Sequence, residues 1–81
     1  MPLKALIVLP TDGRTWVQTM ELPFPPFPGL GIRVDTYEIL NVDSVVIGDH
    51  GCDVTCIVQH EGGPITAEKC EMLGFEVAPY P

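Results

Sequence analysis

The stretch from Tyr37 to His60 constrains the fold of this chain more than any other part of the sequence. In its second half, apolar residues occupy every second position, at Cys52, Val54, Cys56 and Val58. Such alternation is typical of a strand with one buried face and one wet face. Residues 48–51, with the sequence GDHG, have the composition of a tight turn between two strands. The stretch therefore predicts a long β-hairpin.

The register of this hairpin can be predicted from what a buried face accepts. A three-residue loop would pair Val42 with Val58 across the hairpin. A two-residue loop would shift the pairing by one residue and set Asp43 against Cys56, which a buried face should reject because a carboxylate loses its hydration there. We therefore expect the three-residue loop.

Three apolar residues of the hairpin do not fit a sheet with only one covered face. Val45, Ile47 and Ile57 point to the second face in the expected register. Either that face is partly covered, or a β-bulge near Val45 and Val46 turns the side chains inward.

Three further segments have the composition of strands. Residues 4–9 form a strand-like segment that is continuously apolar from Ala5 to Leu9, as in a central strand covered on both faces, and we expect Pro10 to end it. We expect a strand over residues 15–22, because Thr15, Trp16 and Val17 favour strands. A helix is the alternative for this segment. Residues 30–36 alternate again and predict a third strand before the hairpin.

The last quarter of the chain predicts one short helix. Thr66 offers an N-cap, Glu68 lies in the first turn where an anion is favoured, and Gly74 supplies the stop. We expect a two-turn helix over 67–73 with Cys70 on its buried side, near enough to approach Cys56 as a reduced thiol pair. Residues 75–77 are expected to add a short last strand.

Residues 23–29, with the sequence PFPPFPG, are the most unusual stretch of the chain. Proline fixes an extended path and donates no backbone hydrogen bond, so the stretch predicts a stiff connector or an edge. Its two P-x-x-P spacings also suit a ligand of aromatic grooves, but no basic residue flanks them. A connector that covers the core with Phe24 and Phe27 is the preferred interpretation.

Together these segments predict a single small domain over residues 1–81 that is mainly β, at the margin of α+β. We expect a small curved antiparallel sheet, or a half-open barrel, of about five strands with one short C-terminal helix. Hydrophobic residues make up 46% of the chain, which is hard to hide in so small a volume. The composition therefore raises the expectation of a homodimer or a protein partner.

The net charge of −7 argues against binding to nucleic acid, since the four cations are scattered along the sequence. An acidic surface that mimics nucleic acid is a further interpretation, which the even spread of the carboxylates does not favour. No stretch approaches the roughly 20 apolar residues of a membrane helix, and the apolar run at Ala5 is too short for a secretory signal. We expect a cytoplasmic protein with three reduced cysteines and no membrane partner.

Residues competent for metal binding gather on the hairpin, at His50, Cys52, Cys56 and His60. Four residue-to-residue steps along an extended strand place Cys52 and Cys56 about 13 Å apart, whereas zinc–sulfur bonds measure about 2.3 Å. We therefore expect no metal site and no cofactor. His60 ends the apolar face. On that face it would be a partly buried group near Leu40 whose titration affects stability, but a residue at the last position of a strand is more often exposed.

The sequence offers little for catalysis. Ser44 is the only serine and is expected in mid-strand, far from either histidine. The strongest enzymatic or small-ligand candidate is the turn end of the hairpin, with Asp49, His50, Cys52 and Asp53. A polar turn on an acidic chain explains the same residues more simply, and we expect no enzyme activity.

The leading functional hypothesis is a non-enzymatic protein-interaction module that works through self-association or a protein partner. Its expected surface consists of the apolar residues that are hardest to place in one small core. These residues are Trp16, Phe24, Phe27, Val45, Ile47 and Ile57.

Overall fold

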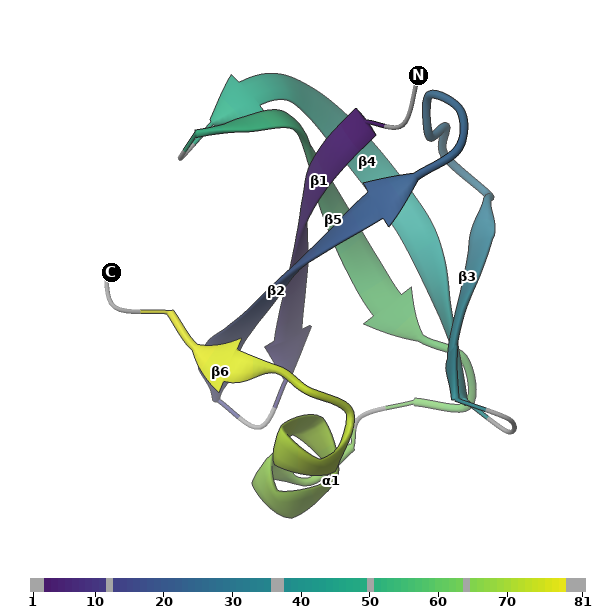
Figure 1. The fold of residues 1–81 in the computed structure, drawn as a ribbon. Coiled ribbons are helices and arrows are strands. Elements are labelled where there is room, and N and C mark those ends of the chain that lie inside the picture. Colours follow the sequence, from purple (N-terminus) through teal and green to yellow (C-terminus); the bar gives the residue numbers. More distant parts are fainter. Residues whose placement is uncertain (1–2, 12, 36–37, 50, 64, 79–81) are drawn as a thin grey trace.

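The computed structural model describes residues 3–11, 13–35, 38–49, 51–63 and 65–78. Six strands form one sheet that curls into a half-barrel, and a short helix lies at one end of it (Figure 1). The elements are β1 (Leu3–Thr11), β2 (Arg14–Leu22), β3 (Gly31–Asp35), β4 (Glu38–Asp49), β5 (Cys52–His60), α1 (Ala67–Met72) and β6 (Glu76–Val77). The predicted mainly β fold with one short C-terminal helix is confirmed, with six strands instead of about five.

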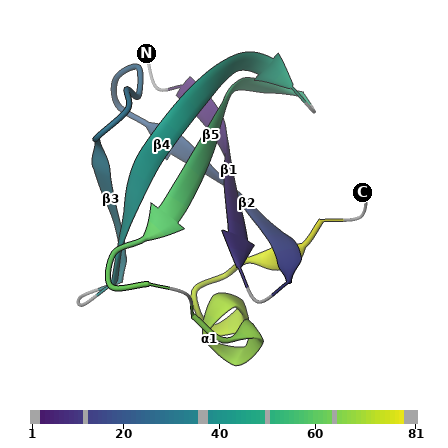
Figure 2. The same cartoon turned by 180° about the vertical axis from the view of Figure 1, so that it is seen from behind.

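The strand order in the sheet is β3-β4-β5-β1-β2-β6. Four of the neighbouring pairs are antiparallel, whereas β1 and β5 run parallel in the middle of the sheet. The expected antiparallel sheet is therefore interrupted once, where the N-terminal strand lies beside the second strand of the hairpin. The two edges of the half-barrel are the short strands β3 and β6, as both views of the ribbon show (Figures 1 and 2).

The position of β1 in the sheet explains its continuous apolar sequence. Ala5 and Ile7 are fully buried on the core face, and Leu6 is also buried on the opposite face. The prediction that Pro10 ends this strand is wrong, because β1 continues to Thr11 and pairs with β2 along its whole length. Pairing of β1 with β5 stops at Val8, so the backbone N–H that Pro10 lacks is not needed on that side.

The core lies on the concave face of the sheet. Its largest fully buried side chains are Trp16, Ile7, Leu9, Leu40, Val58, Cys56 and Cys70. Trp16 is 1% exposed, so it belongs to this core and not to the interaction surface on which we expected it. Residues 15–22 lie in β2, which settles their choice between strand and helix in favour of strand.

The helix α1 forms where the sequence predicts it. The Thr66 hydroxyl accepts a hydrogen bond from the Lys69 backbone N–H at 3.2 Å, as an N-cap should. Cys70 is its buried residue, and Gly74 follows with a φ of 92°, a conformation that side chains rarely adopt. The chain then turns back so that Glu76 and Val77 pair with β2.

No helix among the described residues has the length and hydropathy needed to cross a membrane.

Candidate functional site

The β4–β5 hairpin has two parts with different registers. At its base, Leu40 pairs with His60 and Val42 pairs with Val58, as predicted. Beyond Val42 the register shifts, because Asp43 is an extra residue in β4 and Ser44 pairs with Ile57. The hairpin therefore contains a β-bulge close to the position where the sequence suggested one.

The bulge changes the turn end of the hairpin. Asp49 pairs with Cys52, so two residues lie between the strands and the predicted three-residue loop is wrong. A two-residue loop is compatible with the buried face because the bulge leaves Asp43 exposed instead of setting it against Cys56. Val45 then pairs with Cys56 and is partly buried against the core.

Beyond the bulge, β4 loses its neighbour on one side. The last contacts on the β3 side are made by Val42, whose N–H donates to the Leu30 carbonyl and whose carbonyl accepts from the Gly29 N–H, both at 2.8 Å. No described strand pairs with residues 43–49 on that side. We call residues 43–49 the free edge of β4. In Figure 1 the turn end of the hairpin lies at the upper left, away from β3 on the right.

The geometry of the ladder shows which backbone groups the free edge presents. Val42 directs its N–H and C=O away from β5, and alternate residues of a strand direct these groups to the same side. The bulge adds one residue to this alternation, so Val45 and Ile47 direct their N–H and C=O groups to the free side, whereas Val46 directs its own to β5. The free edge therefore offers two donors and two acceptors in the spacing of a strand.

Exposed apolar side chains accompany these backbone groups. Ile47 is 79% exposed and Val46 is 50% exposed, although both are β-branched residues in the middle of a strand. Ile57, on the opposite strand, is partly buried. Of the six residues predicted as an interaction surface, Val45 and Ile47 lie together at this edge.

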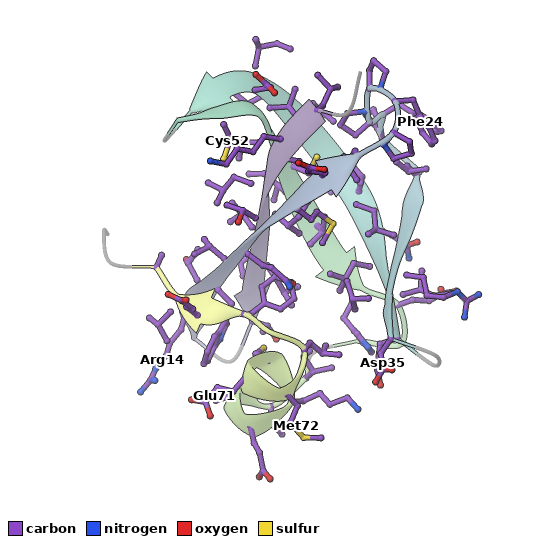
Figure 3. All side chains as sticks on the ribbon, in the orientation of Figure 1. Arg14, Phe24, Asp35, Cys52, Glu71 and Met72 are labelled. Atoms are coloured by element: carbon purple, nitrogen blue, oxygen red, sulfur yellow. The ribbon has the colours of Figure 1, made fainter. Side chains whose placement is uncertain are left out.

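The two predicted phenylalanines form a separate feature. Their rings stack with centroids 6.5 Å apart, and Phe24 and Phe27 are 46% and 52% exposed. Pro26 is the buried residue of this connector, so it covers the core where we expected the phenylalanines to do so. Figure 3 places Phe24 on the far side of the half-barrel from Cys52, which begins β5 at the turn end.

The predicted small-ligand site at the turn is not assembled by the residues that the structure describes. Cys52 is buried on the core side, while Asp53 is exposed and its Oδ2 accepts a hydrogen bond from the Lys4 backbone N–H at 2.9 Å. Adjacent strand residues point to opposite faces, so the Cys52 thiol and the Asp53 carboxylate diverge. His50 and the side chain of Asp49 lie outside the described residues.

A cluster of charged groups at the base of the hairpin was missed by the sequence reasoning. Glu38 of β4 contacts His60 Nε2 with Oε2 and Lys69 Nζ of α1 with Oε1, the latter at 3.0 Å. His60 Nδ1 lies 3.0 Å from the Gly63 carbonyl. The signal was present, because the predicted pairing of Leu40 with His60 places Glu38 diagonally opposite His60 on the same face.

The hydrogen bonds of Glu38, His60 and Lys69 join β4, β5 and α1 at the base of the hairpin. A carbonyl oxygen only accepts, so Nδ1 of His60 donates to Gly63, and Nε2 is occupied by Glu38. Hydrogen bonds from His60 and then from Lys69 hold the pKa of Glu38 below its ordinary value. Since both ring nitrogens are engaged, the imidazole has no free nitrogen for proton abstraction.

The described residues give no metal centre either. No group of three or more histidine, cysteine, aspartate or glutamate side chains in the described ranges converges on one point. The three cysteines are buried thiols, and burial raises the pKa of the Cys56 thiol, which makes it a poor nucleophile. The free edge of β4 is therefore the feature with the clearest capacity for binding.

Comparisons of this chain with protein-family models, with curated proteins and with solved structures give no match.

Proposed function

We propose that this chain is a non-enzymatic protein-interaction module that binds an extended protein segment along the free edge of β4. The observation that carries the proposal is the combination of two features. No strand among the described residues pairs with Val45 and Ile47 on the side away from β5, and the Ile47 side chain is 79% exposed. An added strand gains main-chain hydrogen bonds from such an edge, and its alternate side chains provide specificity.

The rest of the sheet supports this choice of edge. Edge strands are usually kept short or covered, because an exposed edge pairs with other chains. The edge strand β6 has two residues and β3 has five, and the Pro-rich connector leads directly into β3. The free edge of β4 is longer than either strand and contains three consecutive β-branched residues, Val45, Val46 and Ile47. Its retention is explained if a partner strand occupies it.

The alternative of an enzymatic or small-ligand site at the turn gains no observation in its favour from the described residues. We also propose that the chain is cytoplasmic, since its three cysteines are thiols and thiols stay reduced in that compartment.

A pair of proline variants tests the proposal. Ile47→Pro removes an N–H that points to the free side, so the β4–β5 ladder should survive, as prolines are tolerated on edge strands. Val46→Pro removes an N–H directed at β5 and should destabilise the hairpin by about 1–3 kcal/mol. Urea unfolding of the two variants checks this difference.

Binding is then measured with peptides selected from a random heptapeptide library on the wild-type chain. We expect the selected peptides to shift the amide resonances of Val45 and Ile47, and to bind Ile47→Pro at least about tenfold more weakly, since a main-chain hydrogen bond is lost. Ile47→Thr, which keeps the N–H, is the matched control and should retain binding. Peptides that bind Ile47→Pro as well as the wild type, or that shift amides elsewhere, would contradict the proposal.

A further inference from the structure

The β4–β5 hairpin contains carboxylates but no lysine or arginine. Residues 38–61 contain no lysine or arginine, but they contain five carboxylates, Glu38, Asp43, Asp49, Asp53 and Glu61. Glu38 is paired with Lys69 and also contacts His60 at the base. Asp43, which begins the free edge, is exposed, and Asp49 ends that edge. The free edge is thus bounded by an aspartate at each end.

The cations of the chain lie on other elements. Lys4 is in β1, Arg14 begins β2, Arg33 is in the edge strand β3, and Lys69 is in α1. None of them belongs to β4 or β5. The charged side chains on the free edge itself are therefore carboxylates, which disfavour a partner that brings further negative charge to this edge.

This charge pattern acts against a second copy of the chain. Two free edges that pair in antiparallel fashion around Val46 would place Asp43 of each copy opposite Asp49 of the other. Like charges directly opposite one another destabilise a strand pair, and each copy brings a net charge of −7. Self-association through this edge is consequently disfavoured by the facing aspartates and by the net negative charge of each copy.

We infer that the free edge of β4 receives a basic, extended segment of another protein, an inference that rests on the function proposed above. The segment is expected to carry lysine or arginine near both ends, about six residues apart, because Asp43 and Asp49 bound the edge at that spacing. Its central side chains that lie beside Val45 and Ile47 are expected to be β-branched and apolar, since cross-strand pairs of that kind stabilise sheets.

Three capped synthetic peptides test this inference, with the sequences KTVTVTK, QTVTVTQ and ETVTVTE. They share the same β-branched centre and differ only in the charge of their ends. Each is titrated into the isotope-labelled full chain, and amide shifts and the dissociation constant are recorded at low and at physiological salt. We expect the basic peptide to shift Val45 and Ile47 and to bind about tenfold or more tightly than the acidic one, with a difference that shrinks as salt screens it.

The outcomes separate this inference from the proposed function. If all three peptides bind equally at Val45 and Ile47, strand addition stands but the basic class of partner is overturned. If no peptide binds and light scattering shows a dimer that Ile47→Pro abolishes, the edge is an interface between copies and the basic partner is again overturned. If no peptide binds and the chain is a monomer whose edge amides never shift, both the inference and the proposed function fail.

An aspartate variant gives the matched control. Asp43→Asn keeps the size of an exposed side chain and should weaken the basic peptide several-fold, at low salt more than at high salt. Glu21→Gln removes the same charge from β2, which is separated from β4 by β5 and β1, and should leave the affinity nearly unchanged. Equal losses in the two variants would show that net charge alone attracts the peptide, which overturns recognition at the edge.

Discussion

The base and the turn end of the β4–β5 hairpin use similar residues for different purposes. At the base, Leu40 and Val42 are buried, with β3 or its preceding loop on one side and β5 on the other. At the turn end, Val46 and Ile47 are exposed, and among the described strands only β5 pairs with β4 there. The two parts differ in their surroundings and hardly at all in hydrophobicity.

The boundary between these parts is the bulge at Asp43. Before it, the alternation of β4 follows the core of the half-barrel, and after it the strand passes the last described contacts with the β3 side. A bulge increases the local twist and carries the edge away from the sheet. An apolar residue in a strand is thus buried only where neighbouring strands continue, so one strand serves as core in one half and as a binding edge in the other.

The largest expected effect is a difference in the free energy of unfolding between a variant at the base of the hairpin and a variant at its turn end. Leu40→Ala removes a fully buried side chain and should lower the free energy of unfolding by about 2–5 kcal/mol. Ile47→Ala removes a side chain that is 79% exposed and should change the free energy of unfolding by no more than about 0.5 kcal/mol. Chemical denaturation of both variants measures the difference. A large loss for Ile47→Ala would mean that its side chain packs in a core, and the free-edge interpretation would be lost.

The sequence predicted the base of this hairpin well because burial there follows directly from alternation. The pairs of Leu40 with His60 and of Val42 with Val58 required only that apolar residues share a face. The register of the turn end was predicted wrongly because β4 contains an extra residue, Asp43, at the bulge. With this extra residue, a two-residue loop is compatible with a buried face at the base, and alternation alone does not show where an extra residue lies.

The arrangement of the elements in space explains the features that the sequence predicted wrongly or did not predict. Trp16 is expected at the surface as one of the apolar residues that are hardest to place in one small core, but β2 lies inside the sheet beside β1, where the indole is buried. The contact of Lys69 with Glu38 joins a helix to a strand far away in sequence, and no local pattern predicts where that helix packs. The free edge likewise depends on where β3 ends in space, which the composition of β4 does not specify.

A smaller effect is expected from the helix that covers the base. Thr66→Ala removes the N-cap hydrogen bond to Lys69 and should cost about 1 kcal/mol of stability. Figure 2 shows α1 at the end of the half-barrel where β4 begins and β5 ends. Amide hydrogen exchange should therefore accelerate at Glu38 and His60 but remain unchanged at Ile47. Thr66→Ser, which keeps the hydroxyl, should restore the wild-type rates, and equal acceleration at Ile47 would contradict the separation of the two parts.

The smallest effect at neutral pH concerns the contacts of Glu38 with His60 and Lys69. These contacts are expected to make the free energy of unfolding depend on pH. The pKa of Glu38 is lowered from an ordinary value of 4.5, first by its hydrogen bond with His60 and then by that with Lys69. A depressed pKa means that the carboxylate contributes stability above the unfolded value, and that this contribution is lost as the pH falls through the lower folded value. Glu38→Gln should therefore be less stable than the wild type at pH 7, and the stabilities of the two proteins should converge as the pH falls below 4.5.

Urea midpoints measured between neutral and acidic pH test this convergence, with Glu21→Gln as the control for the loss of one charge. If the difference between Glu38→Gln and the wild type stays constant across that range, the carboxylate is not held in its charged form by His60 and Lys69, and the base of the hairpin is maintained by its apolar contacts alone.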